Sequence, residues 1–420
     1  MLKLIFEKRE VILLLVLLIF TVLIRLLLFP VPGAGGDLYY FGQWFHAAAD
    51  RGPCSFYNTN WGDYGVLFCD YVPFNAYIFW IFGSLAKALS LFGTPYITYI
   101  IKLLPTIFDT ATVLLIFAFV RKRFDFRAAL VTAALYAFNP AVTLDSAVWG
   151  QIDAVYTFFL LLSLMLLLKS KPKLSAVVFT IGLLTKPQSI ALAPLLIFLI
   201  LRKYGWRQLL ASLLTATATV FAVILPMEWS NPITFLWNSY FGAYSGYGET
   251  TVNAFNIWAI GGLRQTDTAL FLTAGWVMFG LATAFILYVL RKRLDTSDEL
   301  PILFAAFMLF FSFFMLPTRM HERYLFPALS ILVLMLPFSK KIRPYYGVLT
   351  FTVFANMASV LYFVYNTESH SIPYELAWAV TMINLAVFIF ALIRMPVEFK
   401  GKNVKPVHPT QSSSKSQPEG

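Results

Sequence analysis

The sequence VILLLVLLIFTVLIRLLLF at residues 11–29 holds a single charged residue, and similar apolar runs recur along the whole chain. Runs of this length cross a hydrocarbon core of about 30 Å as helices. Lipid offers no hydrogen-bond partners, so a spanning helix must satisfy its backbone internally. No run alternates like the strands of a membrane barrel. The sequence therefore predicts an all-α polytopic membrane protein.

The composition agrees with this fold class. Of 420 residues, 59% are hydrophobic and 13% are charged, and the mean hydropathy is +0.73. Soluble domains carry about 25% charged residues. A soluble chain of this size has too little interior to bury so much apolar surface. We therefore expect one membrane-embedded bundle rather than two or three soluble domains.

Clusters of basic residues separate the apolar runs and predict the orientation of the chain, because cytoplasmic loops are enriched in Lys and Arg. Both termini are then cytoplasmic. The net charge of +11 fits this topology and contact with anionic membrane lipids, and it does not indicate nucleic acid. The clusters are residues 121–123, 169–173, 202–207, 291–293, 340–343 and 400–402.

An even number of crossings must separate two cytoplasmic clusters, and this parity decides two ambiguous segments. Residues 74–92 are expected as an interfacial or re-entrant helix on the outer side. Residues 174–201 are expected as two short helices meeting at Lys186-Pro187. Large outer loops are expected at residues 30–95 and 227–267, and a disordered cytoplasmic tail at 396–420. About twelve membrane helices follow, at 11–29, 96–120, 128–144, 154–168, 174–185, 188–201, 208–226, 268–290, 300–316, 324–338, 345–365 and 376–394.

Polar residues gather in the segments expected on the outer side. Asp37 follows two glycines in GGDLYY (35–40), where a carboxylate can accept a proton or simply occupy a turn or helix cap. In SAVWGQIDA (146–154), Asp153 begins an apolar helix and can act as its cap. Asp145 and Asp153 together favour a functional site, because ionisable groups at membrane ends tend to mark function.

Two further segments carry cations. Lys186 in LLTKPQ (183–188) lies at a helix break, where it either meets an anion or extends to the interface. Arg319, His321 and Arg323 lie between two apolar spans, and Arg side chains suit phosphate oxygens. Glu322 can instead pair with a neighbouring Arg. His321-Glu322 lacks a second His four residues on, so no metal site and no cofactor is expected.

The motifs SAVWGQIDA, LLTKPQ and MHERYLFP (320–327), in this order after an outer Asp, resemble the C-type glycosyltransferase (GT-C) superfamily. The closest similarity is to prokaryotic relatives of the second mannosyltransferase of glycosylphosphatidylinositol-anchor synthesis. The resemblance covers residues 10–395. It implies an active site outside the cytoplasm, a polyprenyl- or dolichyl-phosphate-linked sugar donor, and transfer with inversion to a glycan, lipid or protein acceptor.

On this resemblance, Asp37 is the general base. Gly36 stands where the family often has a bulkier residue, so Asp63 and Asp70 remain competing bases. The resemblance assigns the donor phosphate to Lys186, Arg319, His321 and Arg323. Other substrate contacts are expected from Asp145, Trp149, Gln151, Asp153, Gln188 and Glu322.

Two other classes of protein share some of these features. A transporter or flippase for a lipid-linked or anionic solute also uses broken helices, although this sequence shows no paired half-repeats. A non-catalytic assembly subunit could retain the fold without needing Asp37. The only cysteines, Cys54 and Cys69, share the first outer loop, where either a disulfide or two free thiols fits.

Overall fold

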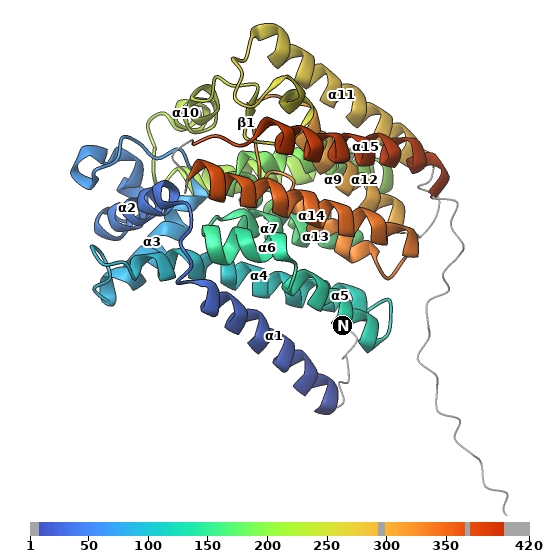
Figure 1. The fold of residues 1–420 in the computed structure, drawn as a ribbon, viewed down its shortest axis with the longest axis horizontal. Coiled ribbons are helices and arrows are strands. Elements are labelled where there is room, and N and C mark those ends of the chain that lie inside the picture. The colour runs from blue at the N-terminus through green and yellow to red at the C-terminus, as the bar shows by residue number, and fades with distance from the viewer. Residues whose placement is uncertain (1–7, 293–298, 366–369, 399–420) are drawn as a thin grey trace, which may run out of the picture.

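The computed structural model describes residues 8–292, 299–365 and 370–398, which form a helical bundle with two very short strands (Figure 1). The α-helices are α1 (Lys8–Leu28), α2 (Gly35–Arg51), α3 (Phe74–Ala88), α4 (Ile97–Arg121), α5 (Phe126–Ala137), α6 (Pro140–Thr143), α7 (Asp153–Leu168), α8 (Pro172–Thr185), α9 (Ala193–Ile224), α10 (Pro232–Ser245), α11 (Ala269–Arg291), α12 (Leu300–Met315), α13 (Phe326–Met335), α14 (Arg343–Ser359) and α15 (Tyr374–Glu398).

Shorter segments connect these helices. The 3-10 turns are η1 (Pro53–Asn58), η2 (Trp61–Tyr64), η4 (Pro187–Leu192), η5 (Ile257–Gly261) and η6 (Lys340–Ile342), and the π-helical turns are η3 (Leu144–Trp149) and η7 (Val360–Val364). The strands β1 (Thr251–Val252) and β2 (Met320–His321) pair in parallel.

Among the described residues, six helices are long and apolar enough to cross a membrane: Lys8–Leu28, Ile97–Arg121, Pro187–Ile224, Ala269–Arg291, Lys340–Val364 and Tyr374–Met395. A bent pair, Phe126–Ala137 with Pro140–Trp149, and four shorter apolar helices complete the bundle. The segment Pro187–Ile224 is two helices, because Gly205 is not helical (φ 81°, ψ 172°). Each of the twelve predicted segments therefore overlaps one or more apolar helices, while α2, α3 and α10 lie outside them, and the predicted polytopic all-α fold is confirmed.

The centre of the bundle is formed by α12 and α13. Every residue of α13 is buried, as is every residue of α12 from Pro301 onward. A helix that is apolar on all sides lies either in a protein core or in lipid, and the burial of α12 and α13 places them in the core. By contrast, α1, α9 and α11 expose many of their apolar side chains, which fits contact with lipid. The bundle thus has a protein-packed centre and an apolar periphery.

Helix breaks follow the proline and glycine positions. Lys186 is extended (φ −152°, ψ 126°) between α8 and η4, so the predicted break at Lys186-Pro187 is present. The expected helix at 128–144 is wrong as a single straight helix. It ends at Ala137, and the chain bends by 46° before the π-turn η3. Pro140 disfavours helical geometry at Asn139, whose side chain instead caps α6.

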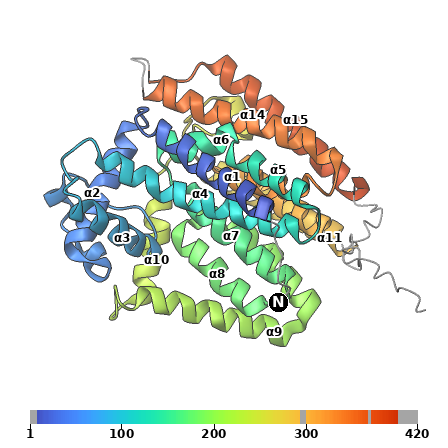
Figure 2. The ribbon, with the colours of Figure 1, turned by 90° about the horizontal axis from the view of Figure 1, so that it is seen from below.

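The first outer loop is more regular than the sequence indicated. Asp37 lies in the first turn of a 17-residue helix, α2, which packs against α3 at one end of the bundle, close to α10 (Figures 1 and 2). The predicted interfacial helix at 74–92 is present as α3, and its position in the membrane stays a prediction. Helix α10 lies within the second outer loop. Helix α15 extends to Glu398, so most of the predicted tail lies outside the described residues.

A buried ion pair ties α1 to its neighbours. Arg25 contacts Asp109 of α4 at 3.0 Å with both side chains fully buried, and Arg25 Nη1 donates to the Ala137 carbonyl at 2.9 Å. The Tyr136 hydroxyl donates to the other Asp109 oxygen at 2.8 Å. Lys102 donates to the carbonyls of Phe29 and Val31, both at 2.8 Å, and so satisfies the end of α1. These contacts fix the position from which the chain enters α2.

We expect Asp109→Ala to lower the melting temperature of the detergent-purified protein more than the double variant Arg25→Leu/Asp109→Leu. Removing one partner of a buried pair costs about 3–5 kcal/mol, whereas replacing both by apolar groups is often neutral. Glu10→Gln is the control, because the pair between Glu10 and Arg121 is partly exposed and should contribute at most about 1 kcal/mol. Equal losses in the single and double variants would show that Arg25 is not held by its ion pair.

Candidate active site

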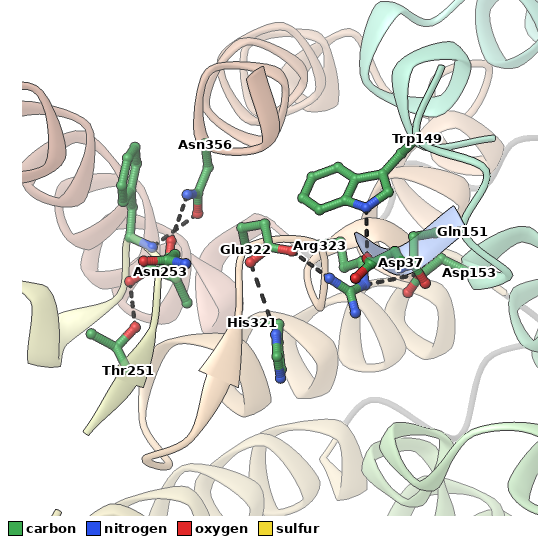
Figure 3. A network of polar contacts seen from close by, with 12 residues as sticks. Asp37, Trp149, Gln151, Asp153, Thr251, Asn253, His321, Glu322, Arg323 and Asn356 are labelled. Carbon is green, nitrogen blue, oxygen red and sulfur yellow. Dashed lines mark hydrogen bonds and ion pairs between the residues drawn. The ribbon is translucent and has the colours of Figure 1, made fainter. Parts of the chain in front are cut away.

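Four segments far apart in the sequence meet beside the start of α2. They are the first turn of α2, the junction of η3 with α7, the break between α8 and η4, and the loop around β2. Figure 3 shows residues of the first, the second and the last of these. Charged side chains from all four lie close together: Asp37 bonds to Trp149 and Gln151, Asp153 pairs with Lys186 and Arg323, and Arg323 lies over the Trp149 ring. The bundle therefore brings together most of the polar residues that the sequence singled out.

Asp37 is held by one of its two carboxylate oxygens. Asp37 Oδ2 accepts hydrogen bonds from Trp149 Nε1 at 2.8 Å and from Gln151 Nε2 at 2.6 Å (Figure 3). The second oxygen, Oδ1, lies 3.5 Å from the Tyr365 hydroxyl. The side chain is partly exposed. The carboxylate is thus oriented by two N–H donors on one oxygen, while the other oxygen has the longer contact with Tyr365.

The turn that presents Trp149 and Gln151 depends on Gly150. Gly150 is left-handed (φ 84°, ψ 24°), and its N–H and that of Gln151 both donate to the Asp145 carbonyl. A Cβ atom at position 150 would lie 2.9 Å from a methyl group of Leu38. Glycine relieves both constraints, since it adopts this conformation at no steric cost. Two adjacent donors can then point at the same oxygen of Asp37.

Asp153 joins two of the predicted phosphate ligands. Asp153 Oδ2 lies 2.7 Å from Lys186 Nζ and 3.5 Å from Arg323 Nε. The side chain of Asp153 is fully buried, and that of Lys186 is 6% exposed. Arg323 also pairs with Glu322, and its guanidinium lies over the Trp149 ring, 5.5 Å from the centroid. Charges this deeply buried are stable only when paired.

The loop around β2 holds Arg319 and His321. Arg319 has a left-handed backbone (φ 64°), and its Nε donates to Asp267 Oδ2 at 2.8 Å. The His321 ring packs on Tyr247 and Tyr324. Burial, with the nearby Arg323 and Lys186 charges, lowers the pKa of His321 well below its usual range. The imidazole is therefore a neutral hydrogen-bonding group near pH 7.

Helix α14 anchors the backbone of the segment next to this loop. Asn356 donates to the Asn253 carbonyl at 2.7 Å and accepts from the Phe255 N–H at 2.9 Å, which fixes the segment just after β1 (Figure 3). Because β1 pairs with β2, the anchor also fixes the backbone of Met320 and His321.

A cavity of about 660 Å³ opens beside the network, and Lys186, Arg319, His321 and Arg323 all line it. Gln188 and Asp70 line it too, and burial raises the pKa of the Asp70 carboxyl. The rest of the wall is mostly apolar and includes Leu183, Leu184, Ile190, Val220, Ile233, Leu236, Trp237, Phe241, Trp276 and Phe313. Cations thus lie along an apolar chamber. Asp37 is linked to the cavity wall through Gln151. Gln151 accepts a hydrogen bond at 3.2 Å from the hydroxyl of Tyr71, and Tyr71 lines the cavity.

The other acidic residues and the cysteines that the sequence singled out lie in different places relative to the cavity. Asp145 is fully buried and is not among the cavity-lining residues, and neither of its carboxylate oxygens has a hydrogen-bond partner within the described ranges. Asp63 is exposed and accepts from Asn60, outside the cavity lining. Of the two competitors to Asp37, only Asp70 lines the cavity. Cys54 and Cys69 are free thiols.

Three residues of the site were missed in the sequence. Asp267 pairs with Arg319, Tyr71 connects Gln151 to the cavity, and Tyr365 faces Asp37. Tyr71 follows Asp70 directly and could have been included with it. Asp267 and Tyr365 carry no local signal, because each lies in an ordinary polar loop next to an apolar run and belongs to none of the motifs.

The fold and site define a polytopic helical membrane protein with a charged, partly enclosed chamber. Residues 72–229 match the sequence profile of the family described as dolichyl-phosphate-mannose-protein mannosyltransferase. This segment contains Asp145, Trp149, Gln151, Asp153, Lys186 and Gln188. The match covers less than half of the chain, and over that segment it agrees with the predicted resemblance to the GT-C superfamily. The closer similarity to glycosylphosphatidylinositol mannosyltransferases stays a prediction.

Comparison with solved structures finds the archaeal oligosaccharyltransferase AglB from Archaeoglobus fulgidus. In complex with an inhibitory peptide and a dolichol-phosphate, it shares 14% identity with a TM-score of 0.40, covering 91% of this chain and 56% of AglB. Its apo form gives the same values. The chain thus spans about half the length of these proteins. No curated protein matches the sequence.

We expect Gly150→Ala to lower the melting temperature, because an L-residue in the left-handed region costs about 1–2 kcal/mol and its Cβ would press on Leu38. Gly280→Ala is the matched control. Gly280 lies in α11 with open space where a Cβ atom would stand, and alanine is the better helix former. Equal melting temperatures for both variants in a thermal scan would contradict the requirement for glycine at position 150.

Proposed function

We propose that this chain is an inverting glycosyltransferase that transfers a hexose, mannose in the first instance, from a polyprenyl- or dolichyl-phosphate carrier to an acceptor hydroxyl. The observation that carries the proposal is the cavity, whose apolar wall holds four nitrogen-bearing side chains. The fixed carboxylate of Asp37 lies outside the cavity lining and is linked to it through Gln151 and Tyr71. A lipid-linked sugar phosphate has the matching parts: an apolar chain, an anionic phosphate and a reactive anomeric carbon between phosphate and acceptor.

The donor phosphate is proposed to bind at Lys186, Arg319, His321 and Arg323. Arg323 can offer its guanidinium fork to two phosphate oxygens, whereas Lys186 acts as a compact positive charge. Neutral His321 can donate one N–H. Asp153, Glu322 and Asp267 keep these cations in position before the donor binds. Such preorganised positive groups stabilise the charge that develops on the leaving phosphate.

Asp37 is proposed as the general base. The acceptor hydroxyl gives its proton to Asp37 as its oxygen attacks the anomeric carbon. The bond from that carbon to the phosphate oxygen breaks, and the polyprenyl phosphate leaves with the electron pair. Attack from the side opposite the phosphate inverts the anomeric configuration. Gln188, Asp145 and Glu322 remain proposed contributors to the substrate site.

The positive-charge pattern supports an active site on the extracytoplasmic face with both termini in the cytoplasm. The donor, the acceptor and the surrounding lipids would then be the partners of this protein. A transporter or flippase would move the lipid-linked substrate without forming a product. Purified protein incubated with radiolabelled polyprenyl-phosphate-mannose or polyprenyl-phosphate-glucose and a membrane extract distinguishes these functions by whether a labelled glycoside appears.

We expect Asp37→Asn to reduce transfer by about 100- to 10,000-fold, the usual contribution of a general base, with donor affinity changed less than about twofold. Asp63→Asn, in the same outer loop but exposed and outside the cavity lining, is the control and should retain wild-type transfer. The measurement is the initial rate of label transfer. Full turnover by Asp37→Asn, with loss in Asp70→Asn, would move the base to Asp70.

We expect Arg323→Ala to raise the donor KM by about tenfold or more, because a hydrogen bond to a charged group contributes about 1.5–3 kcal/mol. Arg323→Lys should recover only part of the affinity, since it keeps the charge and loses the fork. Arg264→Ala is the control, as Arg264 is 53% exposed and pairs with Glu249. A donor KM that stays at the wild-type value in Arg323→Ala removes Arg323 from the phosphate site.

A further inference from the structure

The two oxygens of Asp37 are in different surroundings. Oδ2 accepts two short hydrogen bonds, from Trp149 at 2.8 Å and Gln151 at 2.6 Å. Oδ1 has only the Tyr365 hydroxyl within the described residues, at 3.5 Å, which is long for an O–H···O hydrogen bond. Donors stabilise the negative charge on the oxygen that they contact, so Oδ2 is the weaker proton acceptor. A base at this position therefore acts through Oδ1.

Trp149 has one neighbour in the cavity wall and another outside it. The Arg323 guanidinium, which lines the cavity, lies over the indole ring at 5.5 Å. The Tyr365 ring meets the same indole edge-on, with centroids 6.2 Å apart and an interplanar angle of 79°. Tyr365 is not among the residues that line the cavity. The free oxygen of Asp37 thus faces a group outside the donor chamber.

Tyr365 is reachable from outside the protein. It ends the π-turn η7 after α14, and 37% of the residue is exposed. Its hydroxyl already occupies the position that an alcohol would take when giving a proton to Oδ1. A neutral hydroxyl is the chemistry that fits this place, because the phenol of Tyr365 is the polar group that contacts Oδ1 in the part of the chain that the structure describes.

We infer that Tyr365 lines the acceptor subsite, and that the acceptor hydroxyl displaces the Tyr365 hydroxyl to contact Asp37 Oδ1. This inference rests on the proposed glycosyl transfer. The acceptor then enters beside Tyr365 while the phosphate stays in the cavity, on the Arg323 side of Trp149. Inversion requires this arrangement, since the nucleophile and the leaving group must lie on opposite sides of the anomeric carbon. The ring of Tyr365 also limits the access of water to Oδ1.

In the test, the purified full chain is incubated with radiolabelled polyprenyl-phosphate-mannose and a membrane extract, and two labelled products are measured. Free mannose reports transfer to water, and glycoside reports transfer to hydroxyls of the extract. Tyr365→Ala should raise the ratio of hydrolysis to transfer by about tenfold or more and leave the donor KM within about twofold. Asp37 stays oriented in this variant, because Trp149 and Gln151 hold its other oxygen. Tyr365→Phe, which keeps the ring, should shift the ratio less.

Tyr362→Ala is the matched control. Tyr362 lies in the same π-turn, is 61% exposed, and its ring packs on Phe363. It should keep the wild-type ratio. An unchanged ratio in Tyr365→Ala, or an equal change in Tyr362→Ala, overturns the acceptor subsite while leaving the proposed function standing. A wild-type protein that consumes no donor, into either product, overturns the proposed function and the subsite with it.

Discussion

The ion pairs of Asp153 with Lys186 and Arg323 are the interaction on which the rest of the site depends. One carboxylate oxygen lies near two buried cations that come from different segments of the chain. Removing that carboxylate would leave Lys186 buried without its ion-pair partner and close to Arg323, which would keep only Glu322, and breaking a buried pair in this way is strongly destabilising. The start of α7, the break after α8 and the loop after β2 are held together for this reason.

The same electrostatics connect the fold to the proposed chemistry. A helix break is needed at Lys186, since an unbroken helix would not give its side chain this position near Asp153. Pro187 ends α8 there, and Gly150 turns the chain so that Trp149 and Gln151 face Asp37. The cavity then has carboxylate-paired cations along an apolar wall. A lipid-linked phosphate can contact those cations, while Asp37, held from the other side, keeps one oxygen available.

Much of the fold could be predicted from the sequence, because apolar runs and basic clusters report membrane helices directly. Pro187 marked one break, whereas the bend between Ala137 and Pro140 was missed. The motif residues were found because several polar groups lie close together in each segment. Asp267 and Tyr365 were missed, because each contributes a single side chain to the site. The partner of Asp267 lies 52 residues away along the chain, and the partner of Tyr365 lies 328 residues away. Contacts at such separations depend on how the helices pack, which periodicity does not report.

The central claim is that the cations of the cavity hold the phosphate of a lipid-linked sugar beside Asp37. The most direct measurement is a cryo-electron microscopy structure of the full chain in a lipid nanodisc with polyprenyl-phosphate-mannose bound. The account predicts the phosphate in hydrogen-bond contact with Arg323 and Lys186, the polyprenyl chain along the apolar wall, and the sugar between the phosphate and Asp37. A phosphate bound elsewhere, or a sugar on the far side of the cavity from Asp37, would contradict it.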